Sequence, residues 1–318
     1  MAMFNRSKLN FIKLFLVILI LLTSSINIAQ IKEKTDINIK AKELGITTTE
    51  LQGILNFALR NDETDNPKLD SLAVIKLIGE AAEDFFGISV STAGDVNGDG
   101  YCDVVVGAYH NSANGTFAGR SYIYFGGTSM DSIADVTMTG DTAYDWFGVS
   151  VSTAGDVNGD GYSDVIIGAK QNNFGGHYAG RSYIYFGGTS MDNIADVIMT
   201  GETADDYFGC SVSTAGDVNG DGYSDVIVGA TQYDAIGNNP GRSYIYFGST
   251  SMDNIADVIM TGESADDFFG YSVSTAGDVN GDGYTDVIIG ARFNDSGGND
   301  AGSAYIYINT NVVKSNSC

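Results

Sequence analysis

The sequence is poor in basic residues, proline, histidine and cysteine. Its 318 residues include 16 Lys and Arg against 40 Asp and Glu, which gives a net charge of −24 at pH 7. A chain this acidic repels phosphate backbones, so we expect no nucleic-acid partner, and cation binding is favoured. Two His at unrelated positions supply neither a transition-metal cluster nor a Ser-His-Asp arrangement, so we expect no enzymatic activity.

The three cysteines do not have the pattern of a disulfide framework. Cys102 and Cys210 occupy different positions within an internal repeat, and Cys318 is the last residue of the sequence. A bridge between Cys102 and Cys210 is one alternative. Isolated cysteines that replace serine or a small apolar residue are favoured.

Long apolar runs are also scarce, and the one candidate is Leu14–Leu22. It follows a basic region and precedes small polar residues and Ala29, a pattern that predicts a signal peptide over residues 1–29. The run is shorter than the ~20 residues of a spanning helix, which disfavours the alternative of an uncleaved anchor. No later segment is apolar enough to span a membrane, so we predict a secreted or cell-surface protein.

Glycine and aromatic residues are abundant: the chain has 41 Gly, 18 Tyr and 16 Phe. This composition is typical of many short strands joined by tight turns. An internal repeat organises them. The segment Ser-Thr-Ala-Gly-Asp-Val-Asn-Gly-Asp-Gly-Tyr occurs four times, 61 residues apart, and begins at Ser91, Ser152, Ser213 and Ser274.

Each period predicts four strands, which in the second repeat are Phe147–Ser152, Asp164–Ala169, Arg181–Phe186 and Ala195–Gly201. The second of these is rich in β-branched residues and typical of a strand buried on both faces. Four strands in one period indicate an antiparallel meander, the blade of a β-propeller. The predicted fold is therefore all-β, with repeats that begin near residues 86, 147, 208 and 269.

The two ends of the repeat region predict ring closure. The fourth repeat stops after its third strand, Ala304–Ile308, and an extra strand, Val74–Gly79, precedes the first repeat. That strand would complete the last blade and give four blades with 16 strands over residues 71–308. Residues 30–70 precede the propeller and include a short amphipathic helix over 47–61, and residues 309–318 form a tail.

An acidic loop lies between the first two strands of every repeat. Oxygen atoms at loop positions 1, 3, 5, 7 and 9 suit Ca²⁺, and glycine at position 6 permits the turn that brings them together. The position-7 oxygen is a tyrosine backbone carbonyl. The predicted ligands are Asp95, Asn97, Asp99, Tyr101 and Asp103; Asp156, Asn158, Asp160, Tyr162 and Asp164; Asp217, Asn219, Asp221, Tyr223 and Asp225; and Asp278, Asn280, Asp282, Tyr284 and Asp286.

Two alternatives compete with this calcium loop. An EF-hand requires Glu at position 12, where the chain has strand residues: Val106, Ile167, Val228 and Ile289. Acidic hairpin turns without a metal are the other alternative. They are disfavoured because three carboxylates within nine residues repel one another unless a cation is present.

Paired motifs flank each acidic loop. Phe-Gly precedes it at Phe86-Gly87, Phe147-Gly148, Phe208-Gly209 and Phe269-Gly270, and Gly-Ala follows it at Gly107-Ala108, Gly168-Ala169, Gly229-Ala230 and Gly290-Ala291. In this order the motifs resemble FG-GAP repeats, the modules of the integrin alpha-subunit propeller. The resemblance covers residues 74–308 and implies a propeller with Ca²⁺ in the hairpin between the first and second strands of each blade.

The sequence departs from that family in two ways. The proline after Gly-Ala is replaced by Tyr109, Lys170, Thr231 and Arg292. The family usually closes seven blades and this chain supplies four, so a small or strained ring, an open array and a ring completed by self-association or another chain all stay open as alternatives.

The loops between the second and third strands differ most among the repeats, and the meander places them on the face away from the acidic loops. Their aromatic and polar side chains predict a ligand face for an extracellular protein or glycan: Tyr109, His110, Phe117, Phe174, His177, Tyr178, Tyr233 and Phe293. Loop drift without selection is the alternative.

The resemblance to integrin propellers implies an adhesion or protein-interaction module. The alternatives are a calcium-dependent lectin and, less favoured, an extracellular hydrolase or lyase. Two further expectations concern single residue types. Trp146 should be a core or rim aromatic rather than a sugar platform, and the arginines that begin the third strands should each form an ion pair with a neighbouring Asp rather than contact a ligand.

Overall fold

The computed structural model describes residues 41–42, 47–49, 73–232 and 239–309. The predicted signal peptide and all of the tail except Asn309 lie outside these residues. Of the predicted helix over 47–61, only Thr47, Thr48 and Thr49 are described, and the last two are helical. The chain divides into two units, Met1–Val74 and Ile75–Cys318, and all the strands belong to the second. No helix in the described part of the chain is long and apolar enough to cross a membrane.

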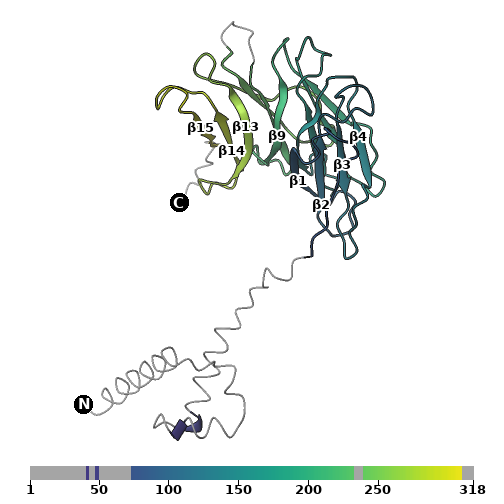
Figure 1. Ribbon diagram of the computed structural model, residues 1–318. Helices are drawn as coiled ribbons and strands as arrows, with labels where there is room; N and C mark the ends of the chain where they lie inside the picture. The colour runs from purple at the N-terminus through teal and green to yellow at the C-terminus, as the bar shows by residue number, and fades with distance from the viewer. Residues whose placement is uncertain (1–40, 43–46, 50–72, 233–238, 310–318) are drawn as a thin grey trace, which may run out of the picture. The chain divides into compact units, whose positions relative to one another are not determined.

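The second unit is built from antiparallel sheets in which the strands follow chain order (Figure 1). Each of the first three sheets has four strands, and the fourth has three in the described residues. The strands are β1 (Ser89–Gly94), β2 (Asp103–Ala108), β3 (Arg120–Tyr124), β4 (Val136–Thr139), β5 (Phe147–Gly155), β6 (Asp164–Ala169), β7 (Arg181–Tyr185), β8 (Val197–Thr200), β9 (Phe208–Gly216), β10 (Asp225–Ala230), β11 (Arg242–Tyr246), β12 (Val258–Thr261), β13 (Phe269–Gly277), β14 (Asp286–Ala291) and β15 (Ser303–Tyr307).

The meander predicted for each repeat is confirmed, and the register repeats from sheet to sheet. Val165 of β6 pairs with Tyr185 of β7, and the equivalent Val226 of β10 pairs with Tyr246 of β11. Every residue of β6 and β10 is buried. This agrees with their β-branched sequences, because these strands are packed on both faces.

The sheets stack face to face through their first strands, so that β1 contacts β5, β5 contacts β9 and β9 contacts β13. A separate hydrophobic core fills each boundary between neighbouring sheets. Between the first two sheets, Phe147 is fully buried and lies edge-on to Tyr183 and Tyr185, with ring centroids 5.3 and 6.4 Å apart. A single sheet has too little surface to form such a core by itself, so the blades stabilise one another.

Glycines allow the sheets to approach closely. A Cβ on Gly168 of β6 would overlap the backbone of Gly209 in β9, and the same holds for Gly107 with Gly148 and for Gly229 with Gly270. These are the glycines of the Gly-Ala and Phe-Gly motifs. The paired motifs therefore mark where two backbones meet, which explains why both recur in every repeat.

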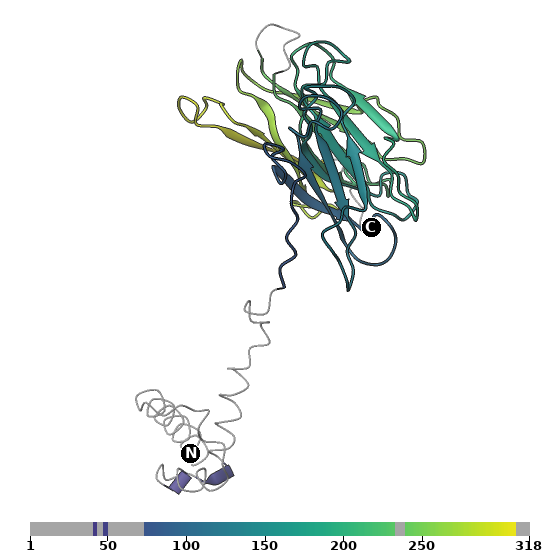
Figure 2. The same cartoon turned by 45° about the vertical axis from the view of Figure 1, so that its right-hand side comes forward.

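The structure does not show the predicted ring closure. Residues 74–79 form no strand, and β15 has no fourth-strand partner among the described residues. Instead, Leu77 packs on the first sheet beside Tyr122 and Tyr124. The contacts run from β1 through β5 and β9 to β13, so β1–β4 and β13–β15 are the two end sheets of the array. Figure 1 shows β13–β15 on the left and β1–β4 on the right, and in Figure 2 the yellow β13–β15 lie on the left. The blades fit a propeller, and the described part of it is an open array.

Candidate functional site

The acidic loops and the variable loops lie at opposite ends of the strands. In an antiparallel meander the turn from strand one to strand two and the turn from three to four share one side. The turn from two to three and the connection to the next sheet share the other. The observed strand order therefore places the predicted metal loops on one side and the predicted ligand face on the opposite side, as the sequence indicated.

The second acidic loop shows how the chain folds around its first aspartate. One carboxylate oxygen of Asp156 accepts hydrogen bonds from the Gly159 and Asp160 amides at 2.7 and 3.1 Å, and the other accepts one from Gly161 at 2.9 Å. The Asn158 amide group donates to Asp160 at 3.0 Å. Gly161 has a φ of +91°, a conformation that favours glycine. The same contacts recur in the other three loops.

The last aspartate of each loop is held differently. Asp164 is fully buried, and its two carboxylate oxygens accept hydrogen bonds from the backbone amides of Val157 and Gly187, both at 2.8 Å. Burial raises the pKa of the Asp164 carboxyl to about 7, and repulsion from Asp160 and Asp156 also acts in this direction. The pKa of Asp225 is raised to about 7 for the same reasons, and that of Asp103 is raised as well.

The donor set of these loops suits a hard divalent cation, because every side-chain donor at the predicted positions is a carboxylate or amide oxygen. The carboxylates of Asp156 and Asp160 also repel that of Asp164, and a bound cation would relieve this repulsion. In the described residues, no three His, Cys, Asp or Glu side chains are close enough together to hold a metal ion. The loop carboxylates bind backbone amides instead, so the structure brings the predicted ligands into one loop without joining them in a cluster.

On the opposite side, the predicted ligand-face residues gather where two sheets meet. His110 stacks on Phe117 with ring centroids 4.1 Å apart, and Tyr109 lies edge-on to Trp146 at 4.9 Å. The ring of Phe85 stacks on Tyr109 at 5.6 Å. These five rings come from the loop after β2 and from the connections that precede β1 and β5. We call them the aromatic cluster.

The remaining predicted residues form smaller groups. His177 contacts Tyr178 at 3.8 Å between ring centroids, and its Nδ1 lies in hydrogen-bond contact with the Asp205 carboxylate at 2.7 Å. Phe293 lies edge-on to Phe268 at 5.1 Å, and the exposed ring of Phe174 lies under the Arg181 guanidinium at 3.5 Å. Tyr233 lies outside the described residues. The predicted ligand face is thus divided among several aromatic groups, and the aromatic cluster has the most ring contacts among the described residues.

Sequence reasoning missed four members of this face, the aromatics that immediately precede each Phe-Gly motif: Phe85, Trp146, Tyr207 and Phe268. All four have a positive φ, between 52° and 57°. This conformation is uncommon for aromatic residues and costs on the order of 1 kcal/mol, so the surrounding fold holds it in place. Trp146 is a rim residue, as expected. The sequence signal that could have identified all four positions is their spacing of 61 residues.

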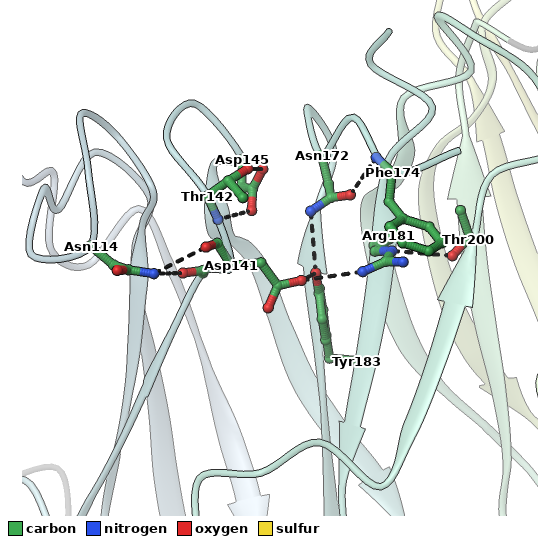
Figure 3. A network of polar contacts seen from close by, with 10 residues as sticks. Asn114, Asp141, Thr142, Asp145, Asn172, Phe174, Arg181, Tyr183 and Thr200 are labelled. Atoms are coloured by element: carbon green, nitrogen blue, oxygen red, sulfur yellow. Dashed lines mark hydrogen bonds and ion pairs between the residues drawn. The ribbon is translucent and has the colours of Figure 1, made fainter. Parts of the chain in front are cut away.

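Buried polar pairs brace the loops of the ligand face. The Asp84 carboxylate accepts a hydrogen bond from the Asn111 side chain at 2.9 Å, and Asp267 accepts one from Asn294 at 2.7 Å. Asp145 accepts hydrogen bonds from the amide and hydroxyl of Thr142 at 2.7 and 2.8 Å (Figure 3). Buried polar groups that are paired by hydrogen bonds hold in place the loops that carry the aromatic residues.

The arginines that begin the third strands form ion pairs, as expected, but the partner is Asp for Arg181 alone and Glu for Arg120 and Arg242. Arg181 binds the Asp141 carboxylate of the preceding sheet at 3.2 Å, and Tyr183 donates its hydroxyl to the same carboxylate at 2.6 Å (Figure 3). Arg120 and Arg242 bind Glu80 and Glu202, each at 2.8 Å. These acids are spaced one period apart along the chain.

Two of the three cysteines fall within the described residues. Cys102 and Cys210 are free thiols, and Cys102 is exposed. The alternative of a bridge between them is therefore wrong, and the favoured interpretation of isolated cysteines is confirmed for these two.

The family model of the FG-GAP repeat matches this chain four times, over residues 86–124, 147–185, 208–246 and 269–307. Each match begins at a Phe-Gly motif and ends with the third strand of a sheet. The chain is also similar to integrin alpha subunits. Integrin alpha-5 of Xenopus laevis is 32% identical over 188 residues, which are 56% of this chain and 18% of the integrin.

Two further relatives extend the match. Integrin alpha-PS2 of Drosophila melanogaster is 33% identical over 230 residues, 67% of this chain and 16% of the integrin. Integrin alpha-8 of Gallus gallus is 28% identical over 248 residues, 74% of this chain and 22% of the integrin. The chain thus spans less than a quarter of the length of each of these three subunits.

Proposed function

The repeat region of this chain belongs to the FG-GAP repeat family and is integrin alpha-like, and on that premise we propose that the chain is a secreted or cell-surface, calcium-binding adhesion or protein-interaction module. The observation that carries this proposal is the separation of two surfaces on one array of sheets. Acidic loops lie at one end of the strands, and braced aromatic loops lie at the other.

Calcium is proposed as a structural ion. Each acidic loop offers oxygen donors from its first, third and fifth residues, and the aspartate at position nine is buried and bound to backbone amides. With a Kd near 10⁻⁴ M, typical of extracellular sites, and about 1 mM free Ca²⁺, each site would add roughly 1.4 kcal/mol to the free energy of unfolding. Four such sites would add about 6 kcal/mol, which is comparable with the stability of a whole domain.

The aromatic cluster is proposed as the main contact for an extracellular partner. Phe85 is exposed and Trp146 is half-buried, so the cluster presents ring surface to solvent although its loops are fixed from within. Aromatic side chains on braced loops contribute contact area at a low cost in conformational entropy. Beside the cluster, a hollow of about 350 Å³ is lined by Glu83, Asp84 and His110. This combination suits a protein surface with basic and apolar groups.

A lectin is the second candidate, because the exposed ring faces would also stack on the apolar faces of sugar rings. Binding of the full chain to immobilised extracellular-matrix proteins and to a glycan array distinguishes the two candidates. The adhesion proposal expects protein binding that free sugars do not compete. Glycan binding that free sugar abolishes would favour the lectin. Trp146 is the single tryptophan of the chain, so its fluorescence reports whether a ligand reaches the cluster.

A further inference from the structure

The three boundaries between sheets are built in the same way. At each, a glycine before the third strand forms a parallel bridge with the phenylalanine that opens the next sheet: Gly119 with Phe147, Gly180 with Phe208, and Gly241 with Phe269. We call the side of a sheet that meets the following sheet its outgoing face, and the opposite side its incoming face. On the outgoing faces, Ile184 is 0% exposed and Ile245 is 5% exposed.

The last sheet carries an outgoing face that no described residue covers. Its Ile306 occupies the position of Ile184 and is 54% exposed, and Val279 is 53% exposed where the equivalent Val157 is fully buried. A Cβ on Gly302, the counterpart of Gly241, would meet only the backbone of its own loop. In the described residues, the outer edge of β15 also lacks the fourth strand that pairs in the other three sheets. An apolar sheet face with an unpaired edge favours association with another strand and sheet.

The first sheet carries the matching incoming face. Its first strand begins at Ser89, whereas β5, β9 and β13 begin at the phenylalanine of the Phe-Gly motif. The corresponding Phe86 stands outside the strand and has no bridging glycine among the described residues. Val90 is 67% exposed, and the equivalent Val151 is 5% exposed because the preceding sheet covers it. One end of the array thus exposes an outgoing face and the other exposes an incoming face, the two surfaces that meet at every boundary between sheets.

Residues 77–80 already lie on the first sheet as the fourth strand of a preceding sheet would lie. Leu77 packs beside Tyr122 and Tyr124, and in the next boundary Met138 of β4 shares a core with Tyr183 and Tyr185. Glu80 binds Arg120, and one period later Asp141 binds Arg181. The first sheet therefore carries the strand segment that the described part of the last sheet lacks.

We infer that a second copy of this chain docks head to tail on the outgoing face of the last sheet. Residues 75–79 of one copy become the fourth strand beside β15 of the other, and Phe86 forms the bridge to Gly302. The register follows from the third sheet, where Ile245 pairs with Val258 and Ser243 pairs with Met260. One period later, the same register pairs Ile306 with Ile75 and Ala304 with Leu77.

A second copy fits better than closure within one chain, because the glycine contacts fix how each pair of sheets meets. Gly107, Gly168 and Gly229 all lie against the backbone of the following sheet. With these contacts in place the described faces at both ends of the array are exposed, so closure within one chain would require the sheets to meet at different angles. Two copies supply eight blades, within the four to eight of common propellers. Two identical junctions then close the ring, as head-to-tail interfaces do when their rotation closes.

Cross-linking between single-cysteine chains tests this junction. One full-length chain carries Ile306→Cys and another carries Ile75→Cys, both on a background of Cys102→Ser, Cys210→Ser and Cys318→Ser. Ile75 and Ile306 are both exposed, so neither substitution disturbs a core. The two chains are mixed in equal amounts, oxidised mildly and separated by mass. Ile255→Cys replaces Ile306→Cys in the control mixture, because Ile255 is also exposed but lies outside the junction.

The inference expects a disulfide-linked pair of chains in the first mixture, with at least tenfold less in the control. No excess over the control would overturn it. A chain with both Ile75→Cys and Ile306→Cys that cross-links only within itself would also overturn it, in favour of closure by one chain.

Sedimentation equilibrium gives a second readout of the same junction. The unmodified chain should have twice the monomer mass, and Ile306→Asp should shift it to the monomer with an unchanged circular dichroism spectrum. A monomeric mass for the unmodified chain at tens of micromolar would contradict the inference.

Discussion

The Asp141 carboxylate, in the connection that leaves the first sheet, accepts a hydrogen bond from the Tyr183 hydroxyl of the second sheet at 2.6 Å. The contact crosses a boundary between blades. Burial raises the pKa of the Tyr183 hydroxyl, and the hydrogen bond to Asp141 raises it further. A charged acceptor makes this hydrogen bond stronger than one between neutral groups. It links the stability of neighbouring repeats through one residue pair.

Tyr183→Phe should lower the free energy of unfolding by about 1 to 3 kcal/mol, because it removes a buried donor from a charged acceptor. Tyr244→Phe, one period later, is the matched control. There the equivalent acid, Glu202, binds Arg242, and no hydrogen bond joins the Tyr244 hydroxyl to a carboxylate in the described residues. Urea denaturation of both variants measures the difference. An equal loss in the two variants would show that the Asp141 contact contributes nothing specific.

Phe208 should be one of the most costly positions to truncate. Its ring is 1% exposed, in the core between the second and third sheets, and lies 5.4 Å from Tyr244 between ring centroids. Phe208→Ala should cost about 3 to 5 kcal/mol through lost burial and the cavity left behind. Ile194→Ala, at an exposed position, should change stability by less than about 0.5 kcal/mol. Similar unfolding midpoints for both variants would contradict a hydrophobic core at each boundary between sheets.

In chelator, the stability of the chain should fall as the pH rises from about 4 to 7. The carboxyls of Asp164 and Asp225 have folded pKa values of about 7, raised by burial, so the folded state holds these protons more tightly than the unfolded chain does. Their contribution is complete below the unfolded pKa and is lost as the pH passes through the folded one. Asp164→Asn with Asp225→Asn should flatten this slope. An unchanged slope in the double variant would place the titrating groups elsewhere.

Trp146→Ala should weaken partner binding more than it lowers the melting temperature. Trp146 packs against Tyr109 and lies 5.1 Å from the Lys170 ammonium on the rim of the aromatic cluster, outside the sheet cores. We expect at least a tenfold loss of affinity for whichever extracellular protein the chain captures, since tryptophan is enriched among the few residues that carry most of the binding energy of an interface. Phe174→Ala is the control, because that exposed ring belongs to a different group. Equal losses for both variants would argue against the cluster as the main contact.

The repeated parts of the structure were predictable from the sequence because each is encoded locally four times. The period of 61 residues, the burial of Asp164–Ala169 and the two loop faces follow from alternation, turn glycines and strand order. The position of Val74–Gly79, which was predicted as a closing strand and forms no strand in the structure, was not predictable in this way. Its pairing depends on the angle between sheets, which is set by glycine contacts between distant residues such as Gly168 and Gly209.

The candidate site was predicted in part for the same reason. The acidic loops are contiguous in sequence, so their positions were clear, but the two backbone amides that bind Asp164 come from Val157 and from Gly187 in another turn. The aromatic cluster combines a loop with the connection into the next sheet, as Tyr109 and Trp146 illustrate. Trp146 also has a positive φ, a backbone conformation that depends on its surroundings and that the sequence does not reveal.

The most direct test of the account is the thermal unfolding midpoint of the full chain in 1 mM CaCl₂ and in chelator. The control variant carries Asp→Asn at the fifth position of every loop, a substitution that keeps an oxygen acceptor for the backbone amide: Asp99→Asn, Asp160→Asn, Asp221→Asn and Asp282→Asn. About 6 kcal/mol from four sites predicts that calcium raises the midpoint of the unmodified chain by on the order of 10 °C or more, and that of the variant far less. Equal midpoints with and without calcium in the unmodified chain would contradict the proposal that these loops hold structural metal ions.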